Sequence, residues 1–463
     1  MRTIHFVSLG CPKNRVDSEV MVGVAMEAGF RIVPAPEDAE VLVVNTCGFI
    51  GEAKQESIDT ILELSELKQD DPDKKLVVAG CLSQRYAGEL ESGLPEVDHF
   101  LGSSDMLKLR QVLDGDAARM LVGNPAEWVV RASDPRALTQ WRASAYVKLA
   151  EGCNRSCAFC TIPEFRGKQR SRSADDIVRE VEQLVAQGVI EINLLSQDTV
   201  AYGRDLPSSG RSSLAEVVRR AADVPGVRWT RVFYLYPETL DEALLELYAQ
   251  HPRVLPYIDM PLQHASDRML KRMKRGSTRA RQHRVVERLR EKVPNLTFRT
   301  AFIVGHPGER DEDFEELCEF VRWAQFDRMG VFRYSDEESA ASFQQDEKVP
   351  AQVIAKRHRK LMSLQRGISR AKNKRLIGQE LEVLVEGESE EHEYVMKGRH
   401  AGQAPEVDGQ VYLSGDEARP GELRRVQISQ ASDYDLVGEL LPQDASASAP
   451  KKKRPRTSLQ VVR

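Results

Sequence analysis

Short, nearly continuous apolar runs separated by helix-spaced apolar positions fill residues 1–125. The runs TIHFVSLG, VLVVNT and KLVVAG lack the polar alternation of a strand with one wet face. They therefore predict parallel strands that are covered on both sides. Residues 49–68 and 104–113 carry apolar side chains at helical spacing. Strands and helices in this order predict a doubly wound parallel α/β sheet.

The same alternation continues through residues 139–375. Strands are predicted near residues 145–150, 190–195, 228–234, 256–260, 297–304 and 328–333. Helices are predicted near residues 173–187, 212–223, 239–248, 266–290 and 311–325. Six such units predict a full or partial parallel (β/α) barrel, whose chemistry belongs to the loops that follow its strands.

The pattern changes again towards the C-terminus. Residues 351–375 predict a helix that joins the barrel to the next domain, and its apolar face carries Ile354, Leu361, Leu364 and Ile368. Short alternating runs with glycines at the turns then predict a small antiparallel β-barrel. The tail is low in complexity and is predicted to be disordered. The predicted domains are 1–125, 139–375 and 376–441, followed by the tail 442–463.

Composition narrows the class of protein. The chain has 463 residues, 41% hydrophobic and 30% charged, with a formal net charge of −5, which is typical of a globular protein. No run approaches the roughly 18 apolar residues of a membrane span, and the N-terminus lacks the apolar core of a signal peptide. These features predict a cytoplasmic enzyme without membrane contact. Seven cysteines in such a chain favour metal or redox chemistry over a disulfide framework.

Three cysteines directly follow the three N-terminal strands. They are Cys11, Cys47 and Cys81. Because ligands of open parallel sheets bind beyond the carboxyl ends of the strands, the three thiols are expected to converge on one site. The alternative is three buried core cysteines. A zinc site is less natural, because its ligands usually come in tight pairs with a fourth ligand.

A second trio lies in the loop after the first barrel strand. Cys153, Cys157 and Cys160 form a C-x3-C-x2-C motif without a fourth thiol nearby. Three thiolates on a four-iron cluster leave one iron free to bind nitrogen and oxygen atoms of a substrate or cofactor. The remaining cysteine, Cys318, lies on an amphipathic helical pattern with Phe314, Leu317 and Val321 and is predicted to be a core residue.

The loop EGCNRSCAFCTIP resembles that of the radical S-adenosylmethionine (SAM) enzymes. The resemblance implies that the open iron chelates SAM and that reductive cleavage yields a 5′-deoxyadenosyl radical. The N-terminal trio narrows the resemblance to the methylthiotransferases, which carry a second cluster on three such cysteines that takes part in sulfur insertion. The implied cofactors are two 4Fe-4S clusters and SAM, and no conventional catalytic base is expected.

Within that superfamily, the strings SLGCPKNRVDSE, LLSQDTVAYG and DMPLQHASDRMLKRMKRG resemble the RimO type. The resemblance implies methylthiolation of the β-carbon of an aspartate in ribosomal protein S-twelve. The sister type modifies an adenosine in transfer RNA, and its first motif reads closer to GCQMN than to GCPKN. One departure is His306 in FIVGHPGE, where family members usually show an aromatic residue; it is interpreted as a local variation.

The charge of the C-terminal barrel bears on the choice between these substrates. Residues 377–440 hold fifteen acidic and five basic residues, a net charge of about −10. Such a surface should repel RNA and attract a basic protein. The alternative is that these acids simply form a solvated face. Residues 268–290 and 351–375 are basic. They predict either contacts with ribosomal RNA or the wet faces of helices.

Other polar residues near strand ends are candidates for cofactor or substrate contacts. Gln197 and Asp198 are assigned to SAM or substrate, with strand-end packing as the alternative, and Gln263 and His264 are interpreted in the same way. Arg166 and Arg170 are candidates to pair with a carboxylate of cofactor or substrate. Gly308 and Glu309 are expected to shape the cofactor pocket.

The resulting hypothesis is a two-cluster radical methylthiotransferase. Its partners are a basic ribosomal protein, free or on the small ribosomal subunit, and an electron donor; transfer RNA is the less favoured substrate. A third hypothesis, from another class, is a non-enzymatic iron–sulfur electron carrier or RNA-binding module. Two sites that each leave an iron open argue against a carrier, which requires complete ligation.

Overall fold

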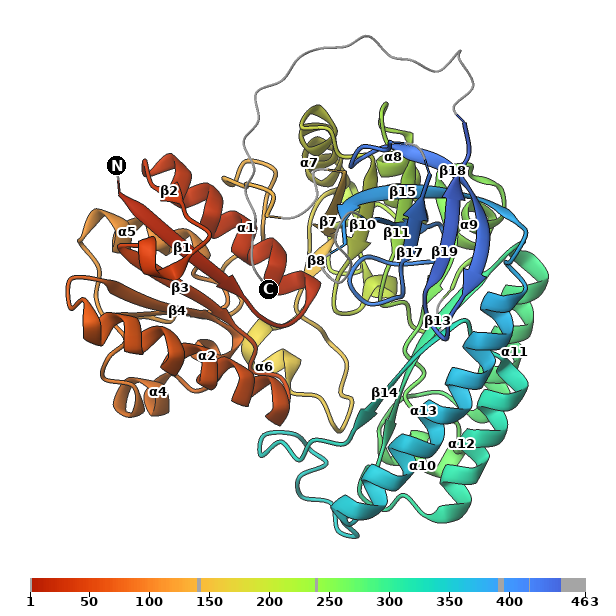
Figure 1. Cartoon of the computed structure of the whole chain (residues 1–463). Coiled ribbons are helices and arrows are strands. Elements are labelled where there is room, and N and C mark those ends of the chain that lie inside the picture. The colour runs from red at the N-terminus through yellow and green to blue at the C-terminus, as the bar shows by residue number, and fades with distance from the viewer. Residues whose placement is uncertain (1, 140–142, 238–239, 390–394, 416, 443–463) are drawn as a thin grey trace.

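The computed structural model describes residues 2–139, 143–237, 240–389, 395–415 and 417–442 (Figure 1). Its N-terminal part is an all-parallel six-stranded sheet in the order β2-β1-β3-β4-β5-β6. The strands are β1 (Thr3–Ser8), β2 (Arg31–Ile32), β3 (Val41–Thr46), β4 (Lys75–Gly80), β5 (His99–Leu101) and β6 (Met120–Leu121). This strand order reverses direction between β1 and β3, where an open α/β sheet binds its ligands.

Helices cover both faces of this sheet, so the predicted doubly wound fold is confirmed. Along β3, Val41 and Val43 belong to one hydrophobic core and Leu42 and Val44 to another. The first core is covered by α1 (Pro12–Glu27) and α5 (Leu109–Asp114), and the second by α2 (Gly51–Asp70) and α4 (Ala87–Gly93). The short helix α3 (Cys81–Arg85) follows β4. The pattern of the sequence did not predict α1.

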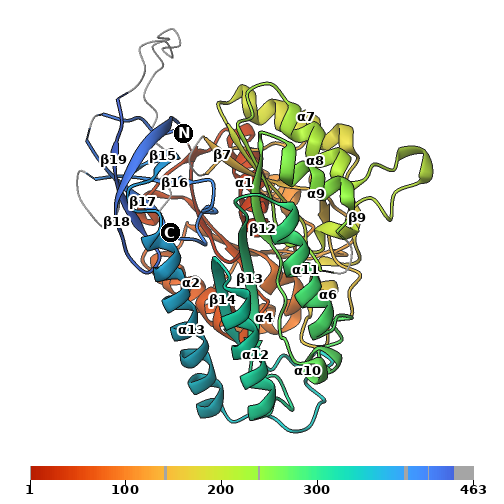
Figure 2. The same cartoon turned by 90° about the vertical axis from the view of Figure 1, so that its right-hand side faces the viewer.

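The central part is a second parallel sheet, in the order β14-β13-β12-β11-β10-β7. Its strands all lie where they were predicted: β7 (Ser144–Lys148), β10 (Glu191–Leu195), β11 (Trp229–Val232), β12 (Val254–Asp259), β13 (Thr297–Val304) and β14 (Arg328–Arg333). The sheet is a partial barrel, because β7 and β14 form its two edges. Helices line its outer face (Figure 2). They are α7 (Ala174–Ala186), α8 (Leu214–Asp223), α9 (Glu242–Gln250), α10 (Asp267–Arg272), α11 (Arg279–Lys292) and α12 (Asp311–Ala324).

The prediction of one helix over residues 266–290 was wrong, because the chain forms α10 and α11 there. Between them, Lys274 and Gly276 have positive φ angles of 53° and 67°, which an α-helix does not allow. The Oγ1 of Thr278 then accepts a hydrogen bond from the N–H of Arg281 and caps α11. The break lets α10 approach the cysteine loop of the barrel, where Ala158 N–H bonds the carbonyl oxygen of Met273.

The predicted connecting helix is α13 (Ala351–Lys374), which buries Leu361 and Ile368 against the central core. The C-terminal part is a closed five-stranded barrel, as predicted, although β17 and β19 pair in parallel. Its strands are β15 (Glu380–Glu388), β16 (Met396–His400), β17 (Val411–Ser414), β18 (Leu423–Ala431) and β19 (Leu436–Leu440). The tail predicted to be disordered lies, from residue 443 on, outside the described residues. None of the described helices is long and apolar enough to cross a membrane.

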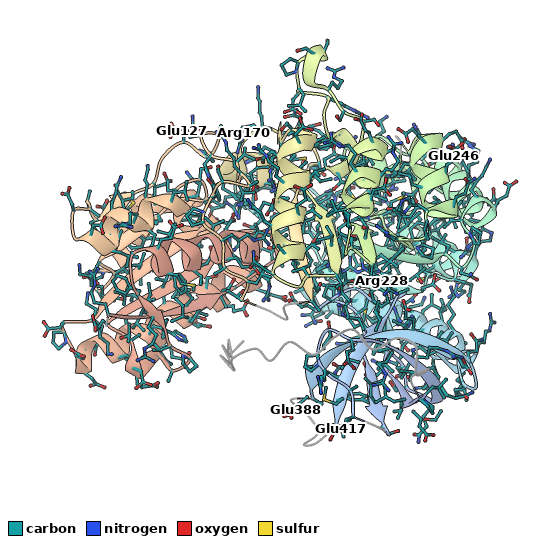
Figure 3. The ribbon with its side chains drawn as sticks, turned by 90° about the horizontal axis from the view of Figure 1, so that it is seen from above. Glu127, Arg170, Arg228, Glu246, Glu388 and Glu417 are labelled. Carbon is teal, nitrogen blue, oxygen red and sulfur yellow. The ribbon has the colours of Figure 1, made fainter. Side chains whose placement is uncertain are left out.

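The three parts share one hydrophobic core. The face of the central sheet opposite its helices carries Tyr146, Phe233 and Tyr257, and these side chains pack in one cluster with Val20 of α1 and Ala404 of the C-terminal barrel. Figure 3 shows the N-terminal part at the left and the C-terminal barrel at the lower right, on two sides of the central part. Helix α1 therefore packs against this face of the partial barrel.

Short elements complete the chain. Two two-residue strands, β8 (Ala150–Glu151) and β9 (Arg170–Ser171), pair on either side of α6 (Ile162–Arg166). Single 3-10 turns cover Pro36–Asp38, Met106–Lys108, Thr199–Ala201 and Ser208–Gly210. The pair β8–β9 closes the base of the cysteine loop.

Candidate functional site

The N-terminal cysteines lie directly after three neighbouring strands. Cys11 precedes α1, Cys47 follows β3, and Cys81 is the first residue of α3. Gly10 lets two of these strand ends touch, because a Cβ at Gly10 would lie 2.8 Å from Cβ and 3.2 Å from Sγ of Cys47. A Cβ at Gly48 would similarly lie 2.8 Å from the carbonyl oxygen of Cys81. The structure thus gathers the three strand ends at one edge of the sheet.

Burial and mutual proximity perturb these thiols. Burial, together with the nearby Cys81 and Cys11, raises the pKa of Cys47 to about 12. Burial also raises the pKa of Cys81, although the guanidinium of Arg166 opposes the rise. In the described ranges, no three His, Cys, Asp or Glu side chains are spaced to hold a single metal ion. A four-iron cluster takes one thiolate on each iron and therefore suits thiols that stand farther apart.

The second trio occupies the loop between β8 and α6. Burial raises the pKa of Cys153 to about 11 and that of Cys160 to about 12, and the thiol of Cys157 adds to both shifts. Because metal ligands are thiolates, their deprotonation must be offset by positive charge. Three thiols gathered in one partly buried loop therefore fit a cationic metal cluster better than they fit three independent free thiols.

Two arginines and a tyrosine surround Cys157. Tyr236 Oη lies 3.3 Å from Cys157 Sγ, and Arg275 Nη1 donates to the same sulfur at 3.4 Å. The guanidinium carbons of Arg155 and Arg275 lie 3.7 and 3.8 Å from the centroid of the Tyr236 ring. Sequence reasoning missed Tyr236 and Arg275, which come from distant loops and carry no motif. Together they place positive charge beside this sulfur.

Arg166 joins the two cysteine trios. It ends α6, directly after the barrel cysteine loop, and its Nε and Nη2 donate to Cys81 Sγ at 3.2 and 3.1 Å. Its Nη1 pairs with Asp17 Oδ2 at 2.7 Å, and Nη2 donates to Asn14 Oδ1 at 2.5 Å. The sequence suggested a partner on cofactor or substrate, whereas here the guanidinium contacts a carboxylate and a thiol of the N-terminal part.

A buried charge network continues from Arg166 into the barrel. Lys148 Nζ lies 2.5 Å from Asp17 Oδ1 and 2.7 Å from Glu151 Oε2, and all three side chains are at most 3% exposed. Burial by itself raises the pKa of Glu151, but Lys148 and Arg166 outweigh it and hold that pKa well below its usual range. The network ties α1 to the first barrel strand through alternating charges.

Gln197 and Asp198 lie beside the barrel cysteine loop. Gln197 Nε2 donates to Glu151 Oε1 at 2.5 Å, and Asp198 Oδ2 accepts from Arg155 Nε at 2.5 Å. The Oε1 of Gln197 is buried and has no partner among the described residues. The two side chains therefore brace the loop at its base and its middle, and Gln197 keeps one acceptor for a further contact.

Gly308 and Glu309 are held by protein contacts. Glu309 Oε2 accepts from Arg357 Nη1 at 2.8 Å, and its Oε1 lies 3.2 Å from His264 Nε2. Gly308 has a φ of +80°, which favours glycine, and a Cβ there would lie 2.5 Å from the guanidinium of Arg272. These residues can form the wall of a pocket, but the carboxylate of Glu309 is already neutralised by Arg357.

Three other predicted residues lie around the barrel mouth. Gln263 has a φ of +70°, a left-handed backbone conformation that costs energy for any residue other than glycine. Arg170 donates to backbone carbonyl oxygens of the 125–128 segment (Figure 3). The ring of His306 packs edge-on against Tyr334, and burial lowers its pKa to about 4. His306 is therefore a neutral packing residue, in line with the interpretation of a local variation.

A buried lysine stands between the N-terminal cysteines and the barrel. Lys13 lies on the first turn of α1, is 9% exposed, and holds its Nζ 3.7 Å from the ring centroid of Tyr234. Tyr234 follows β11 with a φ of +57°, which is rare for an aromatic residue. The backbone N–H of Tyr234 is fixed by Asp259 Oδ2 at 3.0 Å. The sequence had marked Lys13 only as part of a motif.

Two cavities differ in their relation to the cysteines. A cavity of about 240 Å³ lies against the barrel cysteine loop and is lined by Asn154, Arg155, Gln169, Asp198, Ala201, Arg204 and Asp205. Both side-chain polar atoms of Gln169 are buried without a partner in the described part of the chain. A larger cavity of about 460 Å³, between α8 and α9, contains none of the predicted site residues.

Comparison with known proteins agrees with this arrangement. Residues 147–321 match the Radical SAM superfamily, residues 3–102 match the Uncharacterized protein family UPF0004, and residues 377–441 match the TRAM domain. In fold, the chain is similar to the radical SAM methyltransferase TsrM from Kitasatospora setae, with a TM-score of 0.51 at 16% identity over 72% of this chain and 75% of that one. These observations define a radical SAM protein.

The similarity to curated relatives is much closer. Ribosomal protein uS12 methylthiotransferase RimO of Sorangium cellulosum (strain So ce56) is 67% identical over 449 residues, which cover 96% of this chain and 92% of the relative. The protein of the same name from Myxococcus xanthus (strain DK1622) is 48% identical over 441 residues, 95% of this chain and 92% of the relative. The chain belongs to the RimO family of radical SAM methylthiotransferases.

Proposed function

We propose that this chain attaches a methylthio group to the β-carbon of an aspartate in ribosomal protein uS12, using two 4Fe-4S clusters and SAM. The observation that carries the proposal is the pair of three-cysteine sites on either side of Arg166. The name shared by its relatives supports uS12 as the substrate. Each site supplies three thiolates for four irons and leaves one iron for another ligand.

Cys153, Cys157 and Cys160 would hold the barrel cluster, and the trio of Cys11, Cys47 and Cys81 would hold the second one. When bound, these clusters and SAM supply the electron, the hydrogen-abstracting radical and the methylthio sulfur. Each trio has one buried cysteine, Cys81 or Cys153, and two that are partly exposed, so protein atoms shield one side of each site and the other side remains open to a ligand. Arg166 fixes the orientation of one trio relative to the other through Cys81.

We assign supporting roles to the other polar residues of the barrel mouth. Gln197 and Asp198 orient the cysteine loop through Glu151 and Arg155, and the free Oε1 of Gln197 is available to SAM or substrate. Gly308 and Glu309 shape the wall of the SAM pocket, in which Gly308 lets the guanidinium of Arg272 approach the backbone and the carboxylate of Glu309 is neutralised by Arg357.

The C-terminal barrel is proposed to attract the basic substrate protein. Glu388 and Glu417 are exposed at its outer edge (Figure 3), on a segment whose net charge is about −10. Opposite charges steer association, whereas RNA phosphates would be repelled. The reaction would take place in the cytoplasm with a one-electron reductant, and uS12 would be recognised either free or in the small ribosomal subunit.

A reaction with methyl-labelled SAM tests the proposal. The reconstituted enzyme receives uS12 and transfer RNA side by side, under anaerobic reducing conditions. Label is expected in uS12, together with the mass increase of a methylthio group on one aspartate. Label in RNA with none in uS12 would overturn the choice of substrate. A parallel reaction with assembled small subunits separates free from ribosome-bound recognition.

Iron content tests the two cluster sites independently of substrate. Replacement of Cys11, Cys47 and Cys81 by Ala should remove about half of the iron and sulfide of the anaerobically reconstituted protein, and the same change at Cys153, Cys157 and Cys160 should remove the other half. Cys318→Ala is the control, because Cys318 is fully buried in the central core and should leave iron unchanged. Equal iron in all four proteins would refute both sites.

A further inference from the structure

Lys13 is a buried cation that makes no ion pair with the residues that the structure describes. Its side chain is 9% exposed and its ammonium rests on the face of Tyr234. Within the described residues, no carboxylate pairs with this ammonium and no acceptor binds it, whereas the other buried lysine of the region, Lys148, has two carboxylate partners. A buried charge is costly unless it is paired. Cys11 and Glu151 act on this ammonium electrostatically without forming a hydrogen bond or salt bridge with it, so its N–H donors remain open to an anionic ligand.

The nearby carboxylates already have other hydrogen-bonding partners. Asp17 is held by Lys148 and Arg166, and Glu151 is held by Lys148 at 2.7 Å and by Gln197 at 2.5 Å. All their oxygens therefore face inward to existing partners. Because these acids are committed, an incoming carboxylate would not have to displace an internal ion pair in order to reach Lys13.

The position of Lys13 also matches the place where the reaction must happen. It stands two residues after Cys11, a proposed ligand of the sulfur-bearing cluster, and faces Tyr234 at the mouth of the partial barrel. Tyr234 is held there in a strained conformation, with a φ of +57° and its N–H bound to Asp259. Strain of this kind is retained where the surrounding structure needs one side-chain direction.

We infer that Lys13 binds the carboxylate of the substrate aspartate and thereby selects aspartate and orients its β-carbon. The inference rests on the proposed function. In aspartate the carboxylate carbon is bonded directly to the β-carbon, so a cation paired with a carboxylate oxygen fixes the reacting carbon two bonds away. The Tyr234 ring covers one side of the ammonium and leaves its other N–H donors for the carboxylate.

Lys13→Met tests the inference against two forms of the substrate. Methionine keeps the length and apolar body of lysine and removes the charge. Turnover is measured for uS12 and for uS12 with asparagine at the target position. Unproductive binding of both forms is measured by the fluorescence anisotropy of labelled uS12 on the holoenzyme without reductant. Wild type should favour aspartate over asparagine by about 30-fold or more in kcat/KM, the scale of a charge-assisted hydrogen bond. Lys13→Met should reduce this preference to about threefold or less.

Controls separate charge recognition from damage to the cluster. Iron content and the cluster absorption of Lys13→Met should equal those of wild type, and Lys13→Arg should restore part of the preference for aspartate. Lys75→Met is the matched control, because Lys75 begins β4 at the end of the strand opposite Cys81; it should keep the full preference. SAM also carries a carboxylate, so the dissociation constant of SAM is measured for each variant and should remain within about threefold.

The outcomes are distinct. A Lys13→Met enzyme that still prefers aspartate as strongly as wild type overturns the inference, and so does a variant that loses SAM affinity while keeping that preference. A wild-type enzyme that modifies no uS12 refutes the proposed function instead. A third result would assign the lysine to cluster assembly and would also overturn the inference. In that case Lys13→Met loses iron, but it keeps the preference for aspartate in unproductive binding, and Lys13→Arg keeps the same preference.

Discussion

Glu191 offers a sharp test of how the C-terminal barrel is attached to the central sheet. Its carboxylate begins β10, is fully buried, and meets Arg399 of β16 at 2.6 Å and Arg231 of β11 at 3.3 Å. The same two arginines donate to the carbonyl oxygen of Gln403. Glu191→Gln keeps the size of the side chain and removes the negative charge between two buried guanidinium groups.

The size of the effect follows from the environment of the carboxylate. Burial alone raises the pKa of Glu191, but Arg399 and Arg231 outweigh it and lower that pKa from 4.5 to about 2. The difference corresponds to about 3 kcal/mol of stabilisation of the folded junction. Removal of one partner from a buried ion pair costs about 3–5 kcal/mol in other proteins, which is the same range.

The stability that Glu191 contributes depends on pH in a predictable direction. Because the folded pKa lies below the unfolded one, the stabilisation is complete above about pH 4.5 and is lost as the pH falls through about 2. Glu191→Gln has no such titration. The gap in stability between wild type and variant should therefore be constant from pH 7 to pH 5 and should narrow between pH 5 and pH 3.

Amide hydrogen exchange measures this junction without requiring the whole chain to unfold in one step. Residues 401–408 include the buried Gln403 and Ala404, so their amides report separation of the barrel from the sheet. Exchange there should accelerate about 150-fold in Glu191→Gln, which corresponds to about 3 kcal/mol. Glu382→Gln is the control, because Glu382 forms only a solvent-exposed pair with Arg228 at 3.7 Å and should change exchange less than about fivefold. Equal exchange in wild type and Glu191→Gln at pH 7 would refute the reasoning.

Two further changes test the network and the barrel mouth. Arg166→Met leaves Asp17 without one of its cations and Cys81 without two donors. The free energy of unfolding of the apo-protein should therefore fall by about 3–5 kcal/mol, measured by chemical denaturation with tryptophan fluorescence as the signal. Arg170→Met removes only bonds to carbonyl oxygens, so its free energy of unfolding should fall by less than about half of that amount. His306→Phe removes a buried imidazole whose Nε2 has no partner among the described residues and whose pKa is lowered by burial to about 4. Because protonation destabilises the folded wild type as the pH falls from 6.5 towards 4, the variant should lose less thermal stability across that interval. An equal loss in both proteins would count against the argument.

Continuous apolar runs were strong enough to place most strands of both parallel sheets. A strand such as β3, which is covered on both faces, is apolar along most of its length, and this run of apolar residues can be recognised in the sequence itself. The cysteines were found for the same reason, since each N-terminal one directly follows such a run. The break between α10 and α11 was missed, because its glycine and capping threonine lie within a stretch of otherwise helical spacing.

The polar side of the site was less accessible to the sequence. Helix α1 buries Lys13, Asn14, Asp17 and Glu19, so it has no clear apolar stripe and its periodicity is weak. The role of Asp17 can be recognised only in the folded structure, because its partners Lys148 and Arg166 lie far away along the chain. Tyr236 and Arg275 likewise reach Cys157 from distant loops. Long-range charge pairing leaves no local spacing to detect.

The hydrophobic core shared by α1, the central sheet and Ala404 has a consequence for the evolution and engineering of this chain. Side-chain packing and Arg166 hold the two cysteine trios relative to each other, and the segment that connects the two sheets takes part in this packing. Val130 of that segment is buried in the shared cluster, and Arg136 pairs with Glu19 of α1 and Glu180 of α7. Insertions at residues 122–139 are therefore expected to disturb the position of one trio relative to the other. The parts are also poor candidates for exchange with those of a distant relative, because the side chains that each contributes to the shared cluster fit those of its present neighbours.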